Sequence, residues 1–558
     1  MRKNKGVASL LTPLGERLGE AREPLCPRPV MARREWISLD GEWELCYDGG
    51  EVKVRVPYPP QSALSGVGFD PGNRYTYKRK FTLGDLCGRV AVIHFGAVDT
   101  HAEVRLNGRL LGSHSGGYLP FSFELCGLNE GENLLEVSVF DDLDPDFAYG
   151  KQRKNRGGMW YTPISGIWQS VWIDIVPKCH IEALELTPSL DSVRIRVKGG
   201  EAQKRLTLEG GDVYEFEGDE FTLAVPNPEN WTPENPKLYN FTIECGEDRV
   251  SSYFALRTIE AKGGELLLNG KPYYFHGLLD QGYYSDGIYT PAAPEGYEED
   301  LLLAKRLGFN MVRKHAKVEP EIFYYYCDKL GVAVFQDFVN SGKYNFFIDT
   351  ALPTVGLKRG IRKSAGERRK RIFEADGRDM LAFLYNHPSV CCYTIFNEGW
   401  GQYDADRLYK EMKALDPTRI FDTTSGWFFE SESDVDSHHV YFKKVKLEKR
   451  DKPLVLSEFG GYSHKVEGHS YNLDKNYGYK FFGDAESLDK ALKNLYLEEI
   501  VPAVRAGLTA SVLTQLSDVE DETNGLVTYD RRVVKVKEET MTEIRRVIDG
   551  AFSERMEK

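Results

Sequence analysis

Residues 310–338, NMVRKHAKVEPEIFYYYCDKLGVAVFQDF, predict a strand, a helix and a second strand in direct succession. Two apolar strand candidates enclose a helical segment, which is the pattern of a βαβ unit in a parallel sheet. The same rhythm runs through the chain after Arg257. It gives eight strand candidates: PYYFHGLL (272–279), NMVRKH (310–315), VAVFQDF (332–338), VCCYTIFNE (390–398), RIFDTTSG (419–426), DVDSHHVY (434–441), PLVLSEFG (453–460) and LTASVLTQLS (508–517). Eight parallel strands with helical crossovers predict a TIM barrel.

The chain upstream of this barrel predicts two β-sandwiches. Short alternating runs continue from Trp36 to about Val176, and Asn107-Gly108 between two of them is a strong hairpin signal. A shorter set of strand candidates reaches Leu256. We therefore predict a multidomain chain: an N-terminal arm (1–30), an N-terminal β jelly-roll sandwich (31–176), a small immunoglobulin-like β-sandwich (177–256) and a C-terminal (β/α)8 TIM barrel (257–558).

The composition excludes some classes of function. The chain has 558 residues and a formal net charge of −13, which argues against nucleic-acid binding because that requires a basic patch. It has no continuous apolar run of about 18 residues and its basic N-terminus lacks the apolar core of a signal peptide, so we expect no membrane span. Nine scattered cysteines without a CxxC pattern favour reduced thiols and a cytoplasmic location.

Polar residues collect at the C-terminal ends of the barrel strands, where the active sites of TIM barrels lie. A charge at the end of a buried strand is costly unless it is paired or functional. A structural ion pair would explain any one of these residues alone, but their repetition on six of the eight strands favours a site. The candidates are Asp280, Arg313, His315, Asp337, Asn397, Glu398, His438, His439, Tyr441 and Glu458.

Two of these residues have the chemistry of a glycosidase. Glycoside hydrolysis requires two carboxyl groups on either side of the scissile bond, and in the retaining mechanism they lie about 5 Å apart. Glu398 and Glu458 end the fourth and seventh strands, on opposite sides of the barrel mouth. One would be protonated and the other ionised, so we expect their environments to separate their pKa values. Asn397 could bind the sugar 2-hydroxyl. Nearby aromatic residues could form a platform for the sugar: Trp400, Tyr403 and Tyr462.

Several segments resemble glycoside hydrolase family 2. TIFNEGWGQ (394–402) resembles the acid/base segment of the family, and VLSEFGGYS (455–463) resembles its nucleophile segment. Further segments resemble its second and third barrel strands and its N-terminal sugar-binding jelly roll: 308–320, 324–338, 39–45, 56–66, 116–125 and 160–172. The resemblance extends from about residue 27 to 535. An ordered set of segments over three domains is far more specific than a lone Asn-Glu pair.

The resemblance implies hydrolysis of a terminal β-linked sugar through a covalent glycosyl-enzyme intermediate, with no cofactor and no metal. Glu398 would be the acid/base and Glu458 the nucleophile. Tyr441 would lie close to the nucleophile, and one of His438 and His439 would bind substrate hydroxyls. Arg313 could bind the nucleophile carboxylate and keep it ionised.

Other positions depart from the best-known family members. Gln515 stands where a tryptophan usually packs under the sugar, and Asn524 is followed by Gly525 and Leu526 rather than completing the Asn-x-Lys motif of β-glucuronidases. The acidic run 518–522 would repel a uronate if it faced the pocket, or could bind a cation. The aromatic segment 462–482 would either cover the site or pack as a surface loop.

The leading prediction is a retaining exo-β-glycosidase that resembles β-galactosidases and acts on a small glycoside or the end of an oligosaccharide. The alternatives are a β-glucuronidase or another β-glycosidase of the family, an endo-acting barrel enzyme, and a carbohydrate-binding protein without catalysis. The oligomeric state stays open, with a homo-oligomer among the alternatives. The predicted substrate-binding residues are Asn397, Asp280, Arg313, His315, Asp337, Trp400, His438, His439, Tyr441 and Gln515.

Overall fold

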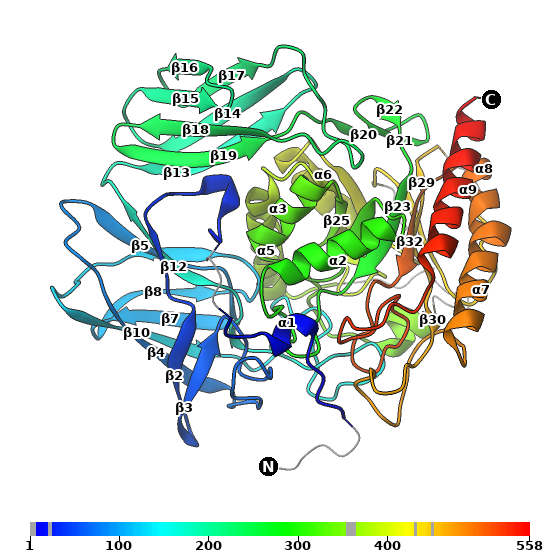
Figure 1. Ribbon diagram of the computed structural model, residues 1–558, viewed down its shortest axis with the longest axis horizontal. Helices are drawn as coiled ribbons and strands as arrows, with labels where there is room; N and C mark the ends of the chain where they lie inside the picture. The colour runs from blue at the N-terminus through cyan, green and yellow to red at the C-terminus, as the bar shows by residue number, and fades with distance from the viewer. Residues whose placement is uncertain (1–6, 21–24, 353–363, 429–431, 448–450, 558) are drawn as a thin grey trace.

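The computed structural model describes residues 7–20, 25–352, 364–428, 432–447 and 451–557. Figure 1 shows two β-sandwiches on one side of the molecule and a barrel on the other, with the C-terminal helix along the far edge. Among the described residues, none of the helices combines the length and apolarity needed to cross a membrane.

The barrel contains all eight predicted strands. They are β23 (Phe275–Asp280), β24 (Met311–Lys314), β25 (Ala333–Asp337), β26 (Val390–Asn397), β27 (Ile420–Ser425), β28 (Asp436–Val440), β29 (Leu454–Gly460) and β32 (Leu508–Thr514). They form one sheet in the order β27-β26-β25-β24-β23-β32-β29-β28, and adjacent strands in it run parallel. The sheet is nearly closed, with β27 and β28 facing each other across the remaining gap. The predicted TIM barrel is confirmed.

Helices lie on the outside of the barrel (Figure 1), and all but the last of them stand between two of its strands along the chain. They are α2 (Glu295–Arg306), α3 (Glu321–Leu330), α5 (Glu367–Leu384), α6 (Ala405–Leu415), α7 (Ala485–Leu495), α8 (Val501–Ala506) and α9 (Glu538–Met556). Short π-helical turns occur at Phe347–Ala351 and Tyr496–Ile500. Helix α3 ends at Gly331, which has a φ of +70°. Glycine adopts this left-handed conformation without steric cost, so the chain can turn there into β25.

A small antiparallel sheet closes the end of the barrel opposite the mouth. It consists of β20 (Ile259–Lys262), β21 (Glu265–Leu268) and β22 (Lys271–Pro272). Its side chains Ile259, Leu266 and Leu268 pack with apolar residues of the barrel strands, including Phe335 and Val455. Burying this apolar surface stabilises the N-terminal end of the barrel. The C-terminal ends of the strands are therefore the open end.

The first sandwich has two main antiparallel sheets. One has the order β1-β12-β5-β9: Trp36–Ser38, Val171–Val176, Val90–Phe95 and Phe121–Glu124. The other has the order β3-β2-β4-β10-β7-β8: Gly50–Val56, Gly41–Tyr47, Arg74–Thr82, Glu132–Phe140, His101–Leu106 and Arg109–Ser115. A short pair, β6 (Val98–Asp99) and β11 (Gly166–Ile167), completes it. The predicted hairpin joins β7 to β8, and Asn107 and Gly108 both have positive φ as a type I′ turn requires.

The second sandwich is smaller. One sheet contains β13 (Ile181–Pro188), β14 (Ser192–Gly199) and β17 (Glu220–Ala224). The other contains β15 (Lys204–Leu208), β16 (Val213–Phe216), β18 (Tyr239–Cys245) and β19 (Asp248–Phe254). The strands of the two sandwiches fall on either side of residue 176, but the exact domain boundaries stay a prediction.

The N-terminal arm is held against the barrel by specific bonds. It contains α1 (Pro13–Glu16) and a 3-10 turn, η1 (Pro29–Met31). The hydroxyl and the N–H of Thr12 both donate to Asp286, at 2.7 and 2.8 Å. The N–H of Val30 donates to Glu321 at 2.9 Å. The arm therefore adds contacts between segments that are far apart in the sequence.

Candidate active site

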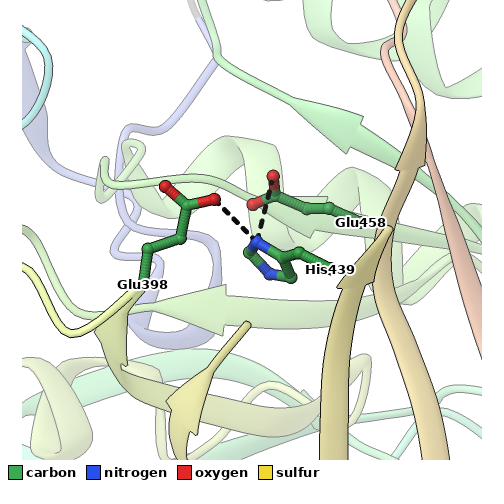
Figure 2. A group of neighbouring side chains, drawn as sticks. All are labelled: Glu398, His439 and Glu458. Carbon is green, nitrogen blue, oxygen red and sulfur yellow. Dashed lines mark hydrogen bonds and ion pairs between the residues drawn. The ribbon is translucent and has the colours of Figure 1, made fainter. Parts of the chain in front are cut away.

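The two predicted catalytic carboxylates lie together at the barrel mouth (Figure 2). Glu458 is on β29, and only 7% of its side chain is exposed. Glu398 directly follows β26 and is somewhat more exposed, at 16%. Its φ of +52° is rare for a residue with a side chain, and its N–H donates to the carbonyl of Ser425 at 3.0 Å. This bond to the end of β27 holds the sharp turn that aims Glu398 into the mouth.

His439 lies between the two carboxylates, as Figure 2 shows. Its Nδ1 is 2.9 Å from Glu398 Oε1 and 3.4 Å from Glu458 Oε2. One potential metal-ligating atom from each of the three residues, a ring nitrogen or a carboxylate oxygen, lies within 4.8 Å of those of the other two. This is the group among the described residues with a geometry that could hold a cation. The same geometry places two carboxyl groups on either side of a narrow gap, with an imidazole that can donate to either.

Arg313, at the centre of β24, organises the site. Its Nη1 donates to Glu458 Oε1 at 3.0 Å, and its Nε donates to Asp337 Oδ1 at 2.9 Å. Its Nη2 donates to Asn397 Oδ1 at 2.9 Å. Only 1% of the arginine side chain is exposed. A buried guanidinium is costly unless its donors are used, and here its three nitrogens bind groups on three other strands of the barrel, β25, β26 and β29.

The environment of Glu458 favours the ionised carboxylate. Burial alone would raise its pKa, but the neighbouring His439 and Arg313 lower the pKa to about 2. Tyr441 donates to Glu458 Oε2 at 2.5 Å. Burial raises the pKa of Tyr441 well above its usual value, so this phenol keeps its proton and acts as a donor. Glu458 therefore remains an oriented anion throughout the physiological pH range.

Asn397 and His315 each have one side-chain nitrogen that binds no other described residue. Asn397 Oδ1 accepts from Arg313 and, at 2.8 Å, from Ser425, so its amide nitrogen points away from both donors. His315 Nδ1 is 2.6 Å from Asp337 Oδ2, and the second ring nitrogen has no partner in the described part of the chain. Together with Arg313, His439 and Tyr441, these residues were predicted from the strand ends, and the structure brings them together.

Two predicted substrate-binding residues do not face the site. Asp280 is buried in an ion-pair network, where it binds Lys314 at 2.6 Å and the N–H of Gly282 at 2.8 Å. Its role is therefore to compensate a buried lysine. His438 points to the other side of β28 from His439 because successive side chains of a strand alternate. Its Nε2 is 3.3 Å from Asp436, and it lines an outer hollow with Val445 and Glu499.

Of the three aromatic residues predicted to form a sugar platform, the structure places one at the barrel mouth. Tyr403 packs against Phe396 behind the strands, and Tyr462 packs against Phe482. Trp400, however, lies two residues beyond Glu398 and joins an aromatic cluster at the mouth. Its ring lies 5.1 Å from Trp160, 5.7 Å from Tyr344 and 5.5 Å from Tyr149. Trp160 also lies under the guanidinium of Arg153, at 3.9 Å.

Gln515 lies at the end of β32 and binds protein groups on both sides. Its Oε1 accepts from Gln281 at 2.9 Å, and its Nε2 donates to Glu522 at 3.2 Å and to Asn524 at 2.8 Å.

The acidic run, residues 518–522, does not form a cation site among the described residues. Its carboxylates diverge to separate protein partners: Asp518 to Lys535, Glu520 to Arg156, Asp521 to Asn472 and Glu522 to Tyr161.

The segment 462–482 lies beside the site, which favours the first of its two interpretations. The ring of Tyr479 stacks on Tyr441 at 3.9 Å and nearly parallel. The N–H of Tyr477 donates to the carbonyl of Asp521 at 2.7 Å, and its carbonyl accepts from Thr523 at 3.1 Å. These bonds tie the segment to the loop that follows β32.

A segment of the first sandwich, residues 149–162, crosses the barrel mouth. At its start, the N–H groups of Tyr149 and Gly150 donate to the carbonyl of Asn340 in the loop after β25, at 3.0 and 3.3 Å. At its end, the N–H of Thr162 donates to Glu520 at 2.8 Å, and the hydroxyl of Tyr161 donates to Glu522. We call this segment the crossing segment. It walls one side of the mouth, and the strand-end pattern in the sequence gave no indication of it.

Two family models match the chain. The model described as Glycosyl hydrolases family 2, TIM barrel domain, matches residues 259–533, and the model Glycosyl hydrolases family 2 matches residues 178–257. Similar curated proteins include a β-galactosidase of Aeromonas hydrophila subsp. hydrophila, 27% identical, with 80% of this chain and 49% of the relative covered. A putative β-glucuronidase of Formosa agariphila is 23% identical, with 78% and 55% covered. The chain thus spans about half the length of these relatives.

Solved structures share the fold over almost the whole chain. A β-D-glucuronidase of Dictyoglomus thermophilum has a TM-score of 0.74 at 20% identity, with 92% of this chain and 97% of the other covered. A β-galacturonidase of Eisenbergiella tayi has a TM-score of 0.69 at 20% identity, with 94% and 99% covered. At this identity the likeness supports the fold alone.

Proposed function

Because the chain belongs to glycoside hydrolase family 2, we propose that it is a retaining exo-β-glycosidase that removes a terminal β-linked sugar. The observation that carries this proposal is the pair of carboxylates at the barrel mouth. An oxygen of Glu398 and an oxygen of Glu458 lie within 4.8 Å of each other. Retaining glycosidases hold their carboxyl groups about 5 Å apart, whereas inverting enzymes leave roughly 6.5–9.5 Å for a water molecule.

The environments of the two glutamates support different roles. Glu458, ionised beside Arg313, is the nucleophile that attacks the anomeric carbon and forms a glycosyl ester. Glu398 donates its proton to the departing glycosidic oxygen. In the second step Glu398 accepts a proton from water, the water oxygen bonds to the anomeric carbon, and the ester to Glu458 breaks. His439, within hydrogen-bond reach of Glu398, can stabilise the carboxylate that Glu398 becomes when it gives up its proton in the first step.

The remaining contacts assign the two sides of the pocket. Asn397 offers its amide nitrogen, and His315 its second ring nitrogen, to hydroxyls of the sugar being cleaved. The acid/base must lie next to the leaving group, so the cluster of Trp400, Trp160 and Tyr344 forms the aglycone side. Aromatic faces there would pack against the apolar surface of the aglycone.

The exo-acting mode is supported by the crossing segment, which closes one side of the mouth where an endo-acting enzyme needs an open cleft. A carbohydrate-binding protein without catalysis has no need for two glutamates held in these distinct environments.

We further propose a cytoplasmic location, because all nine cysteines are free and a reducing compartment keeps thiols in that state.

The sugar is proposed to be galactose-like. Several of the similar curated proteins are named β-galactosidases, and Asn524 is bound to Gln515 rather than standing in an Asn-x-Lys motif. A β-glucuronidase is the second candidate, because one of the curated relatives is a putative β-glucuronidase.

The test is a panel of p-nitrophenyl β-glycosides hydrolysed by the wild type and by Glu458→Ala. We expect the wild type to cleave at least one β-glycoside and the variant to lose more than about 1,000-fold in kcat. Azide should rescue the variant and give an α-glycosyl azide. Near-normal turnover by Glu458→Ala would refute the assignment, and an α-configured first product from the wild type, seen by NMR, would exclude retention.

A further inference from the structure

One cation at the barrel mouth has no role in the reaction proposed above. Lys151 belongs to the crossing segment, and its carbonyl accepts from the N–H of Tyr161 at 3.0 Å. The next residue, Gln152, is buried and anchored: its side chain donates to Asp99 at 3.2 Å and to Tyr118 at 3.1 Å. The main chain that carries Lys151 is therefore fixed, although the residue belongs to a loop of the first sandwich.

The side chain of Lys151 is partly buried and makes no hydrogen bond or ion pair within the described residues. Its ammonium lies 5.9 Å from the centre of the Tyr161 ring. It is close enough to contribute to the electrostatics of Glu458, Glu522 and His315. The hydroxyl of Tyr161 itself binds Glu522, so the lysine lies beside the ring that carries this bond and near both glutamates. A lysine kept unpaired at such a position costs stability, which favours a ligand as its partner.

Glu522 faces the same space from the barrel. The residue is 4% exposed, and its Oε2 accepts from Tyr161 and from Gln515 Nε2, the latter at 3.2 Å. Gln515 is oriented in turn by Gln281. Two donors thus hold one oxygen of Glu522, while its Oε1 has no partner among the described residues. Burial raises the pKa of Glu522, and Lys151 is the strongest of the neighbours that lower it.

We propose that Lys151 and Glu522, contributed by two different domains, form a hydroxyl-binding pair that makes the pocket select a neutral sugar over a uronate. This inference rests on the proposed glycosidase function and specifies its substrate class. An ammonium donates hydrogen bonds and a carboxylate accepts them, and a sugar hydroxyl does both at once. Charge-assisted bonds of this kind are the stronger class of hydrogen bond, so the pair would contribute much of the sugar's orientation.

The charges on this wall argue against a uronate. A sugar carboxylate could pair with Lys151 only by standing close to Glu522 and Glu458 as well. Like charges at such short range in a buried site are costly. Two arginines of the crossing segment are engaged elsewhere: Arg153 lies over the Trp160 ring at 3.9 Å, and Arg156 is bound to Glu520 at 3.0 Å. A neutral glycone adds no charge, and its hydroxyls can bind both the Lys151 ammonium and the Oε1 of Glu522.

The experiment compares Lys151→Met and Glu522→Gln with the wild type on p-nitrophenyl β-glycosides. The substrates are the preferred neutral sugar, its analogues deoxygenated singly at C3, C4 or C6, and the uronide of the same configuration. We expect each variant to lose about 10- to 100-fold in kcat/KM on the parent sugar. The loss should nearly vanish on the analogue that lacks the contacted hydroxyl. The wild type should favour the neutral sugar over its uronide by at least about 100-fold.

Glu520→Gln is the matched control, because this neighbouring glutamate binds Arg156 and Thr162 rather than facing the pocket. It should lower the melting temperature while leaving the ratio of parent to deoxy substrate unchanged. Equal losses by Lys151→Met or Glu522→Gln on the parent and on every analogue would overturn the inference, as would a wild-type preference for the uronide.

Trapping separates this failure from a failure of the proposed function. A 2-deoxy-2-fluoro glycoside should leave a covalent adduct on Glu458, detectable by peptide mass spectrometry. An adduct formed by the fluoro-uronide in preference to the neutral fluoro-sugar would keep the function and refute the selectivity. An adduct on another residue, or catalysis that survives Glu458→Ala, would refute the function and the inference with it.

Discussion

At the residue scale, Arg313 links the proposed nucleophile to the rest of the site. Its guanidinium contacts Glu458, Asp337 and Asn397 simultaneously. Lysine carries the same charge, but its three donors radiate from a single nitrogen and cannot match the wider planar spacing of the donors on Nε, Nη1 and Nη2. The planar fork of arginine is therefore as important here as its charge.

We predict that Arg313→Lys lowers kcat/KM by about 100-fold and moves the acidic limb of its pH profile upward. The nucleophile must be ionised, and loss of the guanidinium contact raises the pKa of Glu458 from about 2 toward its ordinary value of 4.5. Activity at pH 3 to 4 should therefore fall more than activity at pH 7. The measurement is kcat/KM against pH on the folded variant. Arg156→Lys is the control, and an acidic limb that stays in place in Arg313→Lys would contradict the role.

The histidine pair shows what the sequence could and could not predict at this scale. Alternation along a strand requires that only one of His438 and His439 faces the mouth, but it does not say which. The choice depends on the register of β28 against β29, which shifts between these two residues. The ion pair of Asp280 could not be predicted for a similar reason: its partner, Lys314, is on the neighbouring strand, and the pairing of two strand ends is a tertiary contact.

At the scale of elements, the crossing segment completes the pocket through very close contacts. Gly150 has a φ of +58°, and a Cβ atom on it would lie 2.7 Å from the carbonyl oxygen of Ala316. Ala316 follows β24, the strand that carries Arg313. The segment can thus reach the barrel only where a side chain is missing.

We predict that Gly150→Ala lowers kcat/KM by about 10- to 100-fold, because displacement of a pocket wall by a fraction of an ångström misplaces the substrate. Gly68→Ala is the matched control: Gly68 has a φ of +71° in the same sandwich, with nothing within 4 Å of its Cβ position. Gly68→Ala has the strain of an alanine in the left-handed conformation, about 1 kcal/mol, but its Cβ atom clashes with no neighbour. Equal kinetic effects of the two substitutions would show that contact with Ala316 does not position the wall.

Elements differ in how far the sequence predicted them. Most of the barrel strands were found because they contain a short apolar run that the structure buries. Strand β28, DSHHV, is the exception, because it is mostly polar and only partly buried. The crossing segment has neither helical nor strand periodicity. Its decisive partners, Asn340 and Glu520, lie far along the chain, so no local pattern marks it. Lys151 and Glu522 were not predicted as a pair for the same reason.

At the scale of the whole molecule, the site and the stability of the fold depend on the same charges. Glu458 has a pKa of about 2 in the folded chain against an ordinary value of 4.5. A carboxyl group whose pKa is lowered by folding stabilises the folded state at pH values above its unfolded pKa. That contribution, on the order of 3 kcal/mol, disappears as the pH falls through the folded pKa.

We therefore predict that Glu458→Gln melts at a lower temperature than the wild type at pH 7 and that the difference shrinks between pH 4.5 and pH 2. Scanning fluorimetry over this range measures it. Glu467→Gln, at an exposed glutamate, should show a small difference at every pH. A Glu458→Gln difference that stays constant down to pH 2 would mean that the ionised carboxylate does not stabilise the fold.

The crossing segment has a consequence for how such an enzyme changes over evolutionary time. The groups proposed to break the bond are all on the barrel, whereas Lys151, Trp160 and Arg153 belong to a loop of a separate sandwich. Recombination that exchanged only the first sandwich would carry a new set of wall residues to an unaltered reaction centre. The preference for one sugar can thus change through substitutions in the crossing segment, in nature or in a library of loop variants, while Glu398 and Glu458 stay the same.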